Sequence, residues 1–239
     1  MSESTPVRLA RRVAELARSS RAEAEQYILG GWVRVDGEVV EEPQHPVTTE
    51  AVEIDPDARL ETTEPATMLL HKPAGLAFDV TPGLVSPVAR SEGDVSGVRM
   101  LQRHFQHLAP LMPLDAEASG LVVLSQDGRV RRRLTEDADA IEQEFIVEVT
   151  GDDPGPYGLS RLSRGMSYQG RALPACKVSW QNETRLRFAI KAVRPGQLRH
   201  MCAEVGFEVI SIKRIRIGRV PLSKMPAGEW RYLPAGERF

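Results

Sequence analysis

The chain has 239 residues, of which 41% are hydrophobic, and a formal net charge of −2, which suits one large or two smaller globular domains with a real core. No apolar run approaches the roughly 20 residues that span a bilayer, and the first residues lack the apolar stretch of a secretory signal. We therefore expect a cytoplasmic protein without membrane association. Two cysteines, Cys176 and Cys202, are too few for a disulfide framework or a zinc cluster, so we predict no metal.

The charges are unevenly distributed along the chain. Nine Lys or Arg residues but only two acids, Glu204 and Glu208, fall between positions 185 and 219, and a second cluster consists of Arg129, Arg131, Arg132 and Arg133. Basic patches of this kind either contact phosphate or form solvated faces that acids from elsewhere balance. Charge alone leaves both interpretations open.

The first 56 residues are predicted to form two helices, a hairpin and a strand. An apolar face at helical spacing predicts a helix over 7–17. A second helix begins after Ser20, which forms a capping box with the Glu three positions on, and it ends at Gly30. Asp36-Gly37 is a strong hairpin signal, and a further strand is expected at 52–54.

The remainder predicts a larger, strand-rich region. Residues 55–66 are polar and contain two prolines, which is typical of a linker. Beyond it we predict a loop over 79–97, helices over 98–108, 129–138 and 197–205, and strands over 68–70, 121–124, 145–149, 185–191 and 207–220. The fold class is therefore α+β with a mainly antiparallel, mixed sheet.

Asp115 is the most informative single residue. It stands in a loop just before the apolar run 121–124, which the Asp127-Gly128 turn closes. A carboxylate held rigidly beside a core, partly shielded from water, is a candidate reactive group. The alternative is that Asp115 only caps a turn, as Asp often does.

Several motifs together resemble a known family. Arg8-Leu9, residues 20–24 and residues 31–37 are similar to an S4 RNA-binding domain. The Lys-Pro-x-Gly turn at 72–75, the Asp-centred loop at 114–128, Gln197-Leu198-Arg199 and the closing run 216–231 are similar to the S4-domain-containing ribosomal-RNA pseudouridine synthases. The resemblance covers about residues 7–233. It implies an S4-like RNA-binding domain at 1–60 and a pseudouridine synthase catalytic domain at 67–239.

The resemblance also implies roles for individual residues. Asp115 is the expected catalytic carboxylate, and Arg199 is the expected guanidinium partner that orients it and keeps it ionised. Phe145 is expected to stack on the target base, with Leu114 and Ile212 lining an apolar pocket. The reaction that the family catalyses requires no cofactor. The residues expected to bind RNA are Arg11, Arg12, Arg18, Arg21, Arg34 and Lys72, although Lys72 is equally suited to positioning the Asp loop.

Three motif positions depart from the family pattern. Pro113 stands where the family has an Arg that helps to flip the target nucleotide, Ala118 replaces Thr or Ser, and Phe145 lacks the hydroxyl of the family's Tyr. These departures leave an alternative open, a degenerate RNA-binding protein that docks on ribosomal RNA without turnover. A hydrolase that pairs Asp115 with Glu117 is a remote third interpretation. We expect a monomer that acts on ribosomal RNA, and transfer RNA stays open as a substrate.

Overall fold

The computed structural model describes residues 5–60, 64–151 and 155–239. The chain divides into two compact units. Unit 1 comprises residues 1–65 together with 99–106, and unit 2 comprises residues 66–98 and 107–239. Part of the predicted linker, residues 61–63, lies outside the described residues. Within the described residues, no helix has the length and apolar character needed to cross a bilayer.

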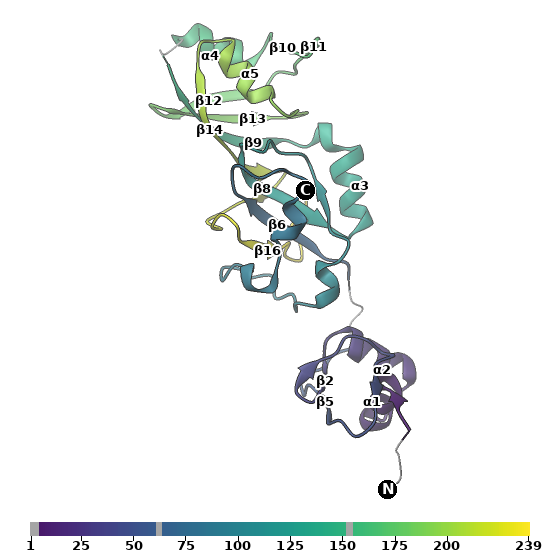
Figure 1. Cartoon of the computed structure of the whole chain (residues 1–239). Helices are drawn as coiled ribbons and strands as arrows, with labels where there is room; N and C mark the ends of the chain where they lie inside the picture. The colour runs from purple at the N-terminus through teal and green to yellow at the C-terminus, as the bar shows by residue number, and fades with distance from the viewer. Residues whose placement is uncertain (1–4, 61–63, 152–154) are drawn as a thin grey trace. The chain divides into compact units, whose positions relative to one another are not determined.

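Unit 1 has the predicted order of two helices, a hairpin and a strand (Figure 1). Its elements are β1 (Val7–Arg8), α1 (Leu9–Ala17), α2 (Arg21–Leu29), β2 (Val33–Val35), β3 (Glu38–Val39), β4 (Pro46–Val47) and β5 (Val52–Ile54). β2 pairs with both β3 and β5, and β1 pairs with β4. The capping box is confirmed, because the Glu23 amide donates to Ser20 Oγ at 3.2 Å and the Ser20 amide donates to the Glu23 carboxylate at 2.7 Å. The helices and β2 enclose a core that includes Leu9, Val13, Ile28 and Val33.

A segment far along the chain completes unit 1. The Arg99 guanidinium donates to the Gly31 carbonyl at 2.7 Å and lies 4.0 Å from the centroid of the Trp32 ring. The Gln102 amide donates to the Glu41 carboxylate at 2.8 Å. The predicted helix over 98–108 is wrong, because only Gln102–Phe105 form a short 3₁₀ helix (η3) and the residues before it extend along unit 1. The predicted domain division had placed this segment in the second domain.

Unit 2 is built on a mixed sheet that is mainly antiparallel, as predicted. Its described residues form nine strands in one sheet, with the order β12-β13-β9-β14-β8-β6-β16 along the main path, while β7 pairs with β8 and β15 with β14. The strands are β6 (Thr67–Lys72), β7 (Ala109–Leu111), β8 (Ser119–Ser125), β9 (Gln143–Thr150), β12 (Lys177–Asn182), β13 (Arg185–Ile190), β14 (Glu208–Ile217), β15 (Val220–Pro221) and β16 (Trp230–Tyr232). Among these pairings, β8 and β14 run parallel.

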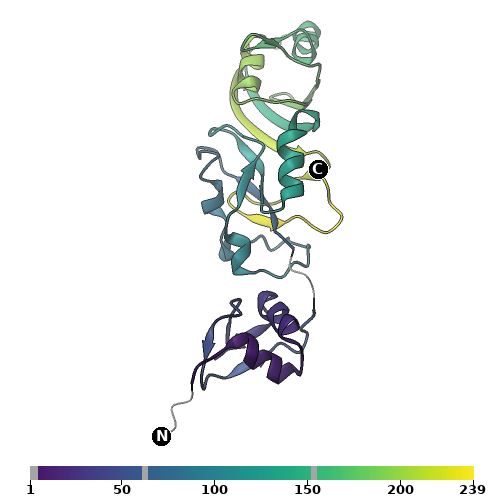
Figure 2. The same ribbon diagram turned by 90° about the vertical axis from the view of Figure 1, so that its right-hand side faces the viewer.

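Helices and short elements flank this sheet. Figures 1 and 2 show α3 (Gly128–Glu136) lying along the sheet beside β8, where Leu134 packs into the core. The helix α5 (Gln197–Ala203) packs on β14. The sequence pattern had not predicted the strands β7, β12, β15 and β16 as separate elements. It had also not predicted α4 (Gly155–Ser163), the hairpin β10 (Ser167–Tyr168) and β11 (Arg171–Ala172), or the 3₁₀ turns η1 (Thr81–Leu84), η2 (Pro87–Ala89) and η4 (Ala138–Ala140).

Gly120 brings the two central strands unusually close. Its φ is +119°, and a Cβ built there would lie 2.3 Å from the backbone oxygen of Arg214. Because no other residue combines this backbone conformation with so little space, a glycine is required at this position. The register then places Arg214 opposite Gly120 on one side and opposite Phe145 on the other. Three segments distant in sequence thereby meet at the end of the Asp115 loop.

Candidate active site

The Asp115 loop is a tight turn held from two directions. The Ala118 amide donates to the Asp115 carbonyl at 3.1 Å, which closes the turn before β8 begins. The Gly75 amide, in the Lys-Pro-x-Gly turn after β6, donates to the Ala116 carbonyl at 2.8 Å. Since β6 and β8 are adjacent antiparallel strands, these two turns lie at the same end of the sheet.

Lys72 links the two turns from inside the protein. Its ammonium donates to the carbonyls of Pro73, Leu76 and Ala116 at 2.8, 2.7 and 2.9 Å, and its side chain is fully buried. Burial lowers the pKa of Lys72, while the carboxylate of Glu117 acts in the opposite direction. The prediction that Lys72 binds RNA is therefore wrong for this structure, because its ammonium group already donates hydrogen bonds to three backbone carbonyls. It positions the Asp loop, which was the other role considered for it.

The Asp115 carboxylate is half-buried and accepts a hydrogen bond from a distant backbone amide. The Gly196 N–H lies 3.1 Å from each of its two oxygens. Gly196 has a φ of +77° and precedes α5 directly. The loop before α5 thus reaches across to the loop before β8, and it orients the carboxylate through the chain's backbone rather than through a side chain.

A small cavity opens beside Asp115. Its lining consists of Pro113, Leu114, Asp115, Phe145, Val193, Arg194, Pro195, Leu198 and Ile212. The cavity volume is about 20 Å³, which accommodates a water molecule rather than a nucleobase. Four of the residues predicted for the site, namely Asp115, Leu114, Phe145 and Ile212, therefore surround one cavity although they come from three separate segments of the chain.

The apolar lining residues are held in place by the sheet. Phe145 on β9 and Ile212 on β14 are buried, with 2% of each exposed, and Leu114 is 6% exposed. Phe145 has an aromatic face but no hydroxyl, so it can stack on a base without taking part in proton transfer. The residues on the opposite wall, Arg194 and Pro195, are exposed. The cavity accordingly has a buried apolar floor and an outer wall with exposed side chains.

Arg199 is not the partner of Asp115 in this structure. Its guanidinium donates to the Val209 carbonyl at 3.1 Å and so ties α5 to β14. Within the part of the chain that the structure describes, neither a hydrogen bond nor an ion pair joins Arg199 to Asp115. The predicted Asp115–Arg199 pair is therefore wrong here, because the helix turns this side chain toward the neighbouring strand.

Arg214 is the cation that the sequence interpretation missed. It is fully buried, and its guanidinium donates to the carbonyls of Met112, Pro113 and Leu121 at 2.9, 3.1 and 2.7 Å. A further bond reaches the Gln143 side-chain oxygen at 3.0 Å. Burial lowers the pKa of Arg214 to about 9, and the negative charge of Asp115 opposes this shift. The guanidinium is thus protonated at neutral pH and lies within electrostatic reach of the Asp115 loop.

The sequence held a signal for Arg214. Alternate residues of a strand face the same side of the sheet, so Arg214 belongs to the face of Ile212, which was already assigned to the pocket. Arg194 was missed as well. It is an exposed residue of the cavity wall, and none of the ion pairs among residues 5–60, 64–151 and 155–239 includes it.

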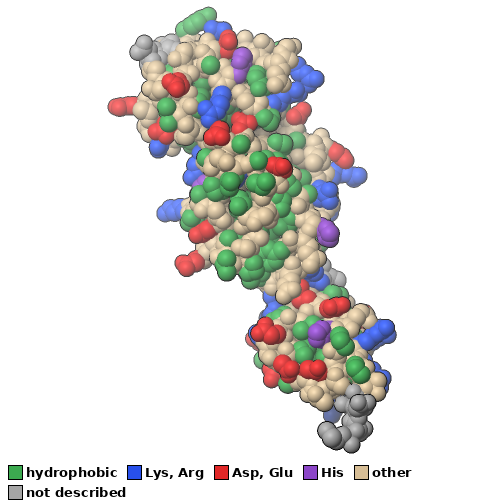
Figure 3. All heavy atoms as spheres, in the orientation of Figure 1, with side chains coloured by type: hydrophobic (Ala, Val, Ile, Leu, Met, Phe, Trp, Pro, Cys, Tyr) green, Lys and Arg blue, Asp and Glu red, His purple; other side chains and the backbone are tan. Residues whose placement is uncertain are grey.

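The five arginines predicted to bind RNA in unit 1 are all exposed: Arg11, Arg12, Arg18, Arg21 and Arg34. Arg11 and Arg21 form ion pairs with Glu15 and Glu25 one helical turn away, at 3.1 and 3.0 Å. Arg11, Arg21 and Arg8 also line a surface groove of about 600 Å³ between α1 and the start of α2. Figure 3 shows Lys and Arg side chains dispersed around the edges of both units rather than forming one continuous patch on the visible face.

No cluster of three or more potential metal ligands occurs among the described residues. Both cysteines are free thiols, and burial raises the pKa of Cys176 to about 11 and that of Cys202 to about 12. At neutral pH both are protonated and unreactive.

The structure defines a small unit of two helices and short strands and a larger unit built on a mixed sheet. The family model described as the S4 domain matches residues 7–52. A crystal structure of a pseudouridylate synthase has the same fold, with a TM-score of 0.58, 20% identity, and coverage of 95% of this chain and 96% of that one.

Sequence relatives cover nearly the whole chain. The dual-specificity RNA pseudouridine synthase RluF of Escherichia coli (strain K12) is 28% identical over 232 residues, which is 97% of this chain and 77% of the relative. The ribosomal large subunit pseudouridine synthase B of Bacillus subtilis (strain 168) is 28% identical over 237 residues, which is 96% of this chain and 93% of the relative. The resemblance predicted from the motifs is thus confirmed: over nearly its whole length the chain is similar to RNA pseudouridine synthases, and residues 7–52 match the S4 domain.

Proposed function

We propose that this protein is an RNA pseudouridine synthase that isomerises a uridine in structured ribosomal RNA. The supporting observation is the cavity in which the Asp115 carboxylate meets the ring of Phe145 and the side chains of Leu114 and Ile212. A carboxylate, an aromatic face and an apolar floor are the groups that an enclosed uridine requires. The relatives named above act on RNA according to their names, and the S4 domain supplies an RNA-binding module.

The proposed reaction is a redox-neutral rearrangement within one nucleotide. The bond between N1 of uracil and C1′ of ribose breaks, the base turns, and a bond between C5 and C1′ forms. The hydrogen of C5 leaves as a proton, and N1 takes up a proton from solvent. Asp115 is the group we assign to attack or to stabilise charge at the sugar or base while the glycosidic bond is broken. No cofactor or metal ion enters this balance.

The target base has to leave the helix stack before it reaches Asp115. Flipping a nucleotide costs a few kcal/mol, and stacking on an aromatic ring recovers about 1–3 kcal/mol. The cavity of about 20 Å³ has to enlarge to admit the base. The exposed side chain of Arg194 on its outer wall can move away for this, because the hydrogen bond to Asp115 comes from the Gly196 backbone and not from Arg194. We assign Arg194 to the phosphate beside the flipped nucleotide, since Pro113 offers no cation at the cavity.

Two groups hold the reaction site in shape. Arg214 and Lys72 bind the backbone carbonyls on either side of Asp115 and place positive charge near it. We assign to Arg214 the electrostatic role that the sequence interpretation gave to Arg199. Because both cations are buried, their charges act on Asp115 through a medium of low polarity, where electrostatic interactions are stronger than in water.

Binding of the RNA as a whole is assigned to unit 1. The exposed arginines of α1, α2 and β2 contact the phosphate backbone and recognise shape rather than base sequence. We propose that the protein acts in the cytoplasm and as a monomer. Transfer RNA is a second candidate substrate of the same chemistry.

The test is to incubate the protein with unmodified ribosomal RNA transcripts, digest them to nucleosides and separate pseudouridine from uridine by chromatography. We expect product from the wild type and from Glu117→Gln, which removes the exposed carboxylate two residues away, and no product from Asp115→Asn. Loss of product in Glu117→Gln as well as in Asp115→Asn would contradict the assignment to Asp115 alone.

The small cavity and the three substituted motif positions favour one rival function, an RNA-binding protein without turnover. In that case the wild type binds ribosomal RNA tightly and produces no pseudouridine, and Asp115→Asn binds equally well. The same experiment therefore separates the two functions.

A further inference from the structure

We infer that Tyr168 is a positioning residue of the Asp115 site, acting through the peptide that joins Pro195 to Gly196. The Tyr168 hydroxyl donates to the Pro195 carbonyl at 2.8 Å. The amide on the other side of that same peptide, Gly196 N–H, donates to both oxygens of Asp115 at 3.1 Å. The peptide between Pro195 and Gly196 thus accepts a hydrogen bond at its carbonyl and donates one from its N–H. A catalytic effect of Tyr168 rests on the proposed function of the site.

The peptide plane makes this coupling direct. The carbonyl of Pro195 and the amide of Gly196 belong to one rigid, planar unit, so fixing the oxygen also fixes the direction of the N–H. The backbone on either side has unusual torsions, with a φ of +77° at Gly196 and +54° at Ala192. Two hydrogen bonds to Gln197 hold Arg194, since the Arg194 amide donates to the Gln197 side-chain oxygen and the Gln197 amide donates to the Arg194 carbonyl, both at 3.1 Å. The hydrogen bond from Tyr168 acts on the next peptide, and it fixes the direction in which the Gly196 N–H points toward Asp115.

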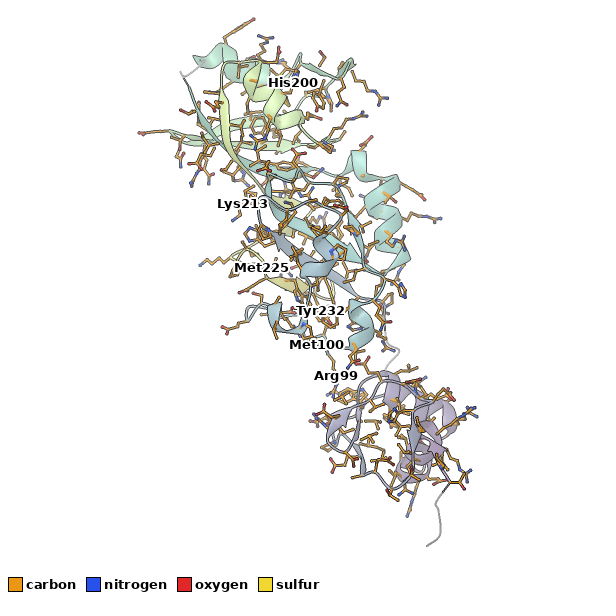
Figure 4. All side chains as sticks on the ribbon, in the orientation of Figure 1. Arg99, Met100, His200, Lys213, Met225 and Tyr232 are labelled. Atoms are coloured by element: carbon orange, nitrogen blue, oxygen red, sulfur yellow. The ribbon has the colours of Figure 1, made fainter. Side chains whose placement is uncertain are left out.

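Tyr168 is itself held rigidly. It ends β10, and the two residues of the turn that follows, Gln169 and Gly170, both have positive φ, as in the tight turns that join antiparallel strands. The Tyr168 ring lies 5.2 Å from the His200 ring, and His200 Nε2 lies 3.0 Å from the Ser167 carbonyl oxygen. Figure 4 labels His200 on α5 beside this hairpin. The hairpin and the first turns of α5 therefore form one support for the 192–196 loop.

The fit between Tyr168 and Gly196 is close. A Cβ added at Gly196 would lie 2.6 Å from the Tyr168 hydroxyl oxygen but 3.7 Å from the ring carbon that bears it. A residue larger than glycine at this position would displace the hydroxyl. The β10–β11 hairpin and the 192–196 loop are therefore closely packed at the Tyr168 hydroxyl oxygen, the atom that donates the hydrogen bond.

The experiment compares Tyr168→Phe with a matched control, Tyr157→Phe. Tyr157 is 80% exposed, so the control removes a phenol hydroxyl from an open surface. Pseudouridine formation is measured in single turnover with saturating RNA, and RNA affinity is measured separately. We expect Tyr168→Phe to lower the single-turnover rate about three- to tenfold, in line with one partly exposed hydrogen bond, with RNA affinity and melting temperature unchanged. Tyr157→Phe is expected to match the wild type.

A second readout does not depend on activity. The amide proton of Gly196, observed by NMR in the full-length protein, is expected to move upfield in Tyr168→Phe because its hydrogen bond to the carboxylate weakens. The same direction of shift is expected in Asp115→Asn. Gly196→Ala provides a further check. The steric part of its damage is expected to shrink in the Tyr168→Phe background, since the atom at 2.6 Å is then missing.

The outcomes separate this inference from the proposed function. An upfield Gly196 amide together with a reduced rate supports the inference. An unchanged Gly196 amide, or an unchanged rate in a wild type that is active, overturns it. If the wild type makes no pseudouridine, the proposed function fails, and the Gly196 amide alone then decides whether Tyr168 orients Asp115.

Discussion

Arg214 shows how much the site depends on groups that are neither reactive nor exposed. Its guanidinium binds three carbonyls, two of which belong to Met112 and Pro113 in the loop that carries Asp115. A buried arginine is costly unless its donors are satisfied, and here they are satisfied by the backbone of the loop itself. The same contacts that stabilise the cation therefore also hold Asp115 in place.

Replacing Arg214 should therefore affect both stability and catalysis. In Arg214→Gln, carbonyls of the Asp loop lose their donors, and we expect the free energy of unfolding to fall by about 2–4 kcal/mol. Urea unfolding measures this change. Arg219→Gln, at an exposed arginine in the turn after β14, is the control and should change stability by less than about 0.5 kcal/mol. An equal effect of the two substitutions would contradict the role of Arg214.

At this scale the sequence predicted some residues and missed others for identifiable reasons. Asp115, Phe145, Leu114 and Ile212 line one cavity, and their catalytic and stacking roles stay predictions. Arg199 was misassigned because sequence spacing does not show which way a helical side chain turns. Arg214 was missed because a charged residue inside an apolar strand looks like a solvent-facing one.

The arrangement of elements explains why the motifs lie far apart in sequence yet meet in space. β8 and β14 run side by side and in parallel, and Gly120 allows their backbones to approach closely. The two helices of unit 1, its β2–β3 hairpin and β5 were predictable from periodicity, capping and turn residues, which act locally. The hairpin β10–β11 and the 3₁₀ segment at 102–105 were not, because tertiary contacts rather than local propensity determine them.

The helices and β2 of unit 1 present the arginines that we expect to bind RNA. Neutralising Arg21 and Arg34 together, as glutamines, is expected to weaken RNA binding and to flatten its dependence on salt by up to about 0.9 per lost phosphate contact in log–log slope. Folding should be almost unaffected, since Arg21 forms only an exposed ion pair with Glu25 and Arg34 binds the Gly37 carbonyl at the surface.

Binding isotherms over a range of salt concentrations measure this slope. The matched control neutralises two exposed arginines of unit 2, Arg219 and Arg238, in the same way. An unchanged slope in the unit 1 variant, or an equal change in both variants, would show that unit 1 does not carry the phosphate contacts.

The molecule as a whole consists of two folding units, and the chain passes from one to the other more than once. Unit 1 takes in residues 99–106, so the chain leaves unit 2 and returns to it. Composition predicted a linker near residue 60, but it did not indicate that residues 99–106 return to unit 1. The contacts that create it, Arg99 with Gly31 and Trp32 and Gln102 with Glu41, join residues about sixty positions apart.

This added segment makes the stability of unit 1 dependent on pH. His104 is 4% exposed, and burial, assisted by the charge of Arg103, lowers its pKa from 6.5 to about 4. The unfolded chain therefore binds a proton at a higher pH than the folded chain does. Above about pH 6.5 the contribution of His104 to the free energy of unfolding is constant. Between pH 6.5 and 4 the free energy of unfolding falls, by about 3 kcal/mol in total.

NMR of the amides of α1 and β2 during urea unfolding at several pH values follows unit 1 alone. His104→Gln should remove most of the loss of stability below pH 6.5, whereas His107→Gln, at an exposed histidine, should leave it unchanged. A variant of His104 that loses stability with falling pH as steeply as the wild type would contradict this account.

The central claim is that the Asp115 carboxylate isomerises uridine in RNA, and the loss of the C5 hydrogen tests it most directly. Ribosomal RNA transcribed with uridine tritiated at C5 should release tritium to water in the presence of the wild-type protein. The rate should fall by at least about a thousandfold in Asp115→Asn, with RNA affinity preserved. Release at equal rates from both proteins, or none from a wild type that binds the RNA, would contradict the claim.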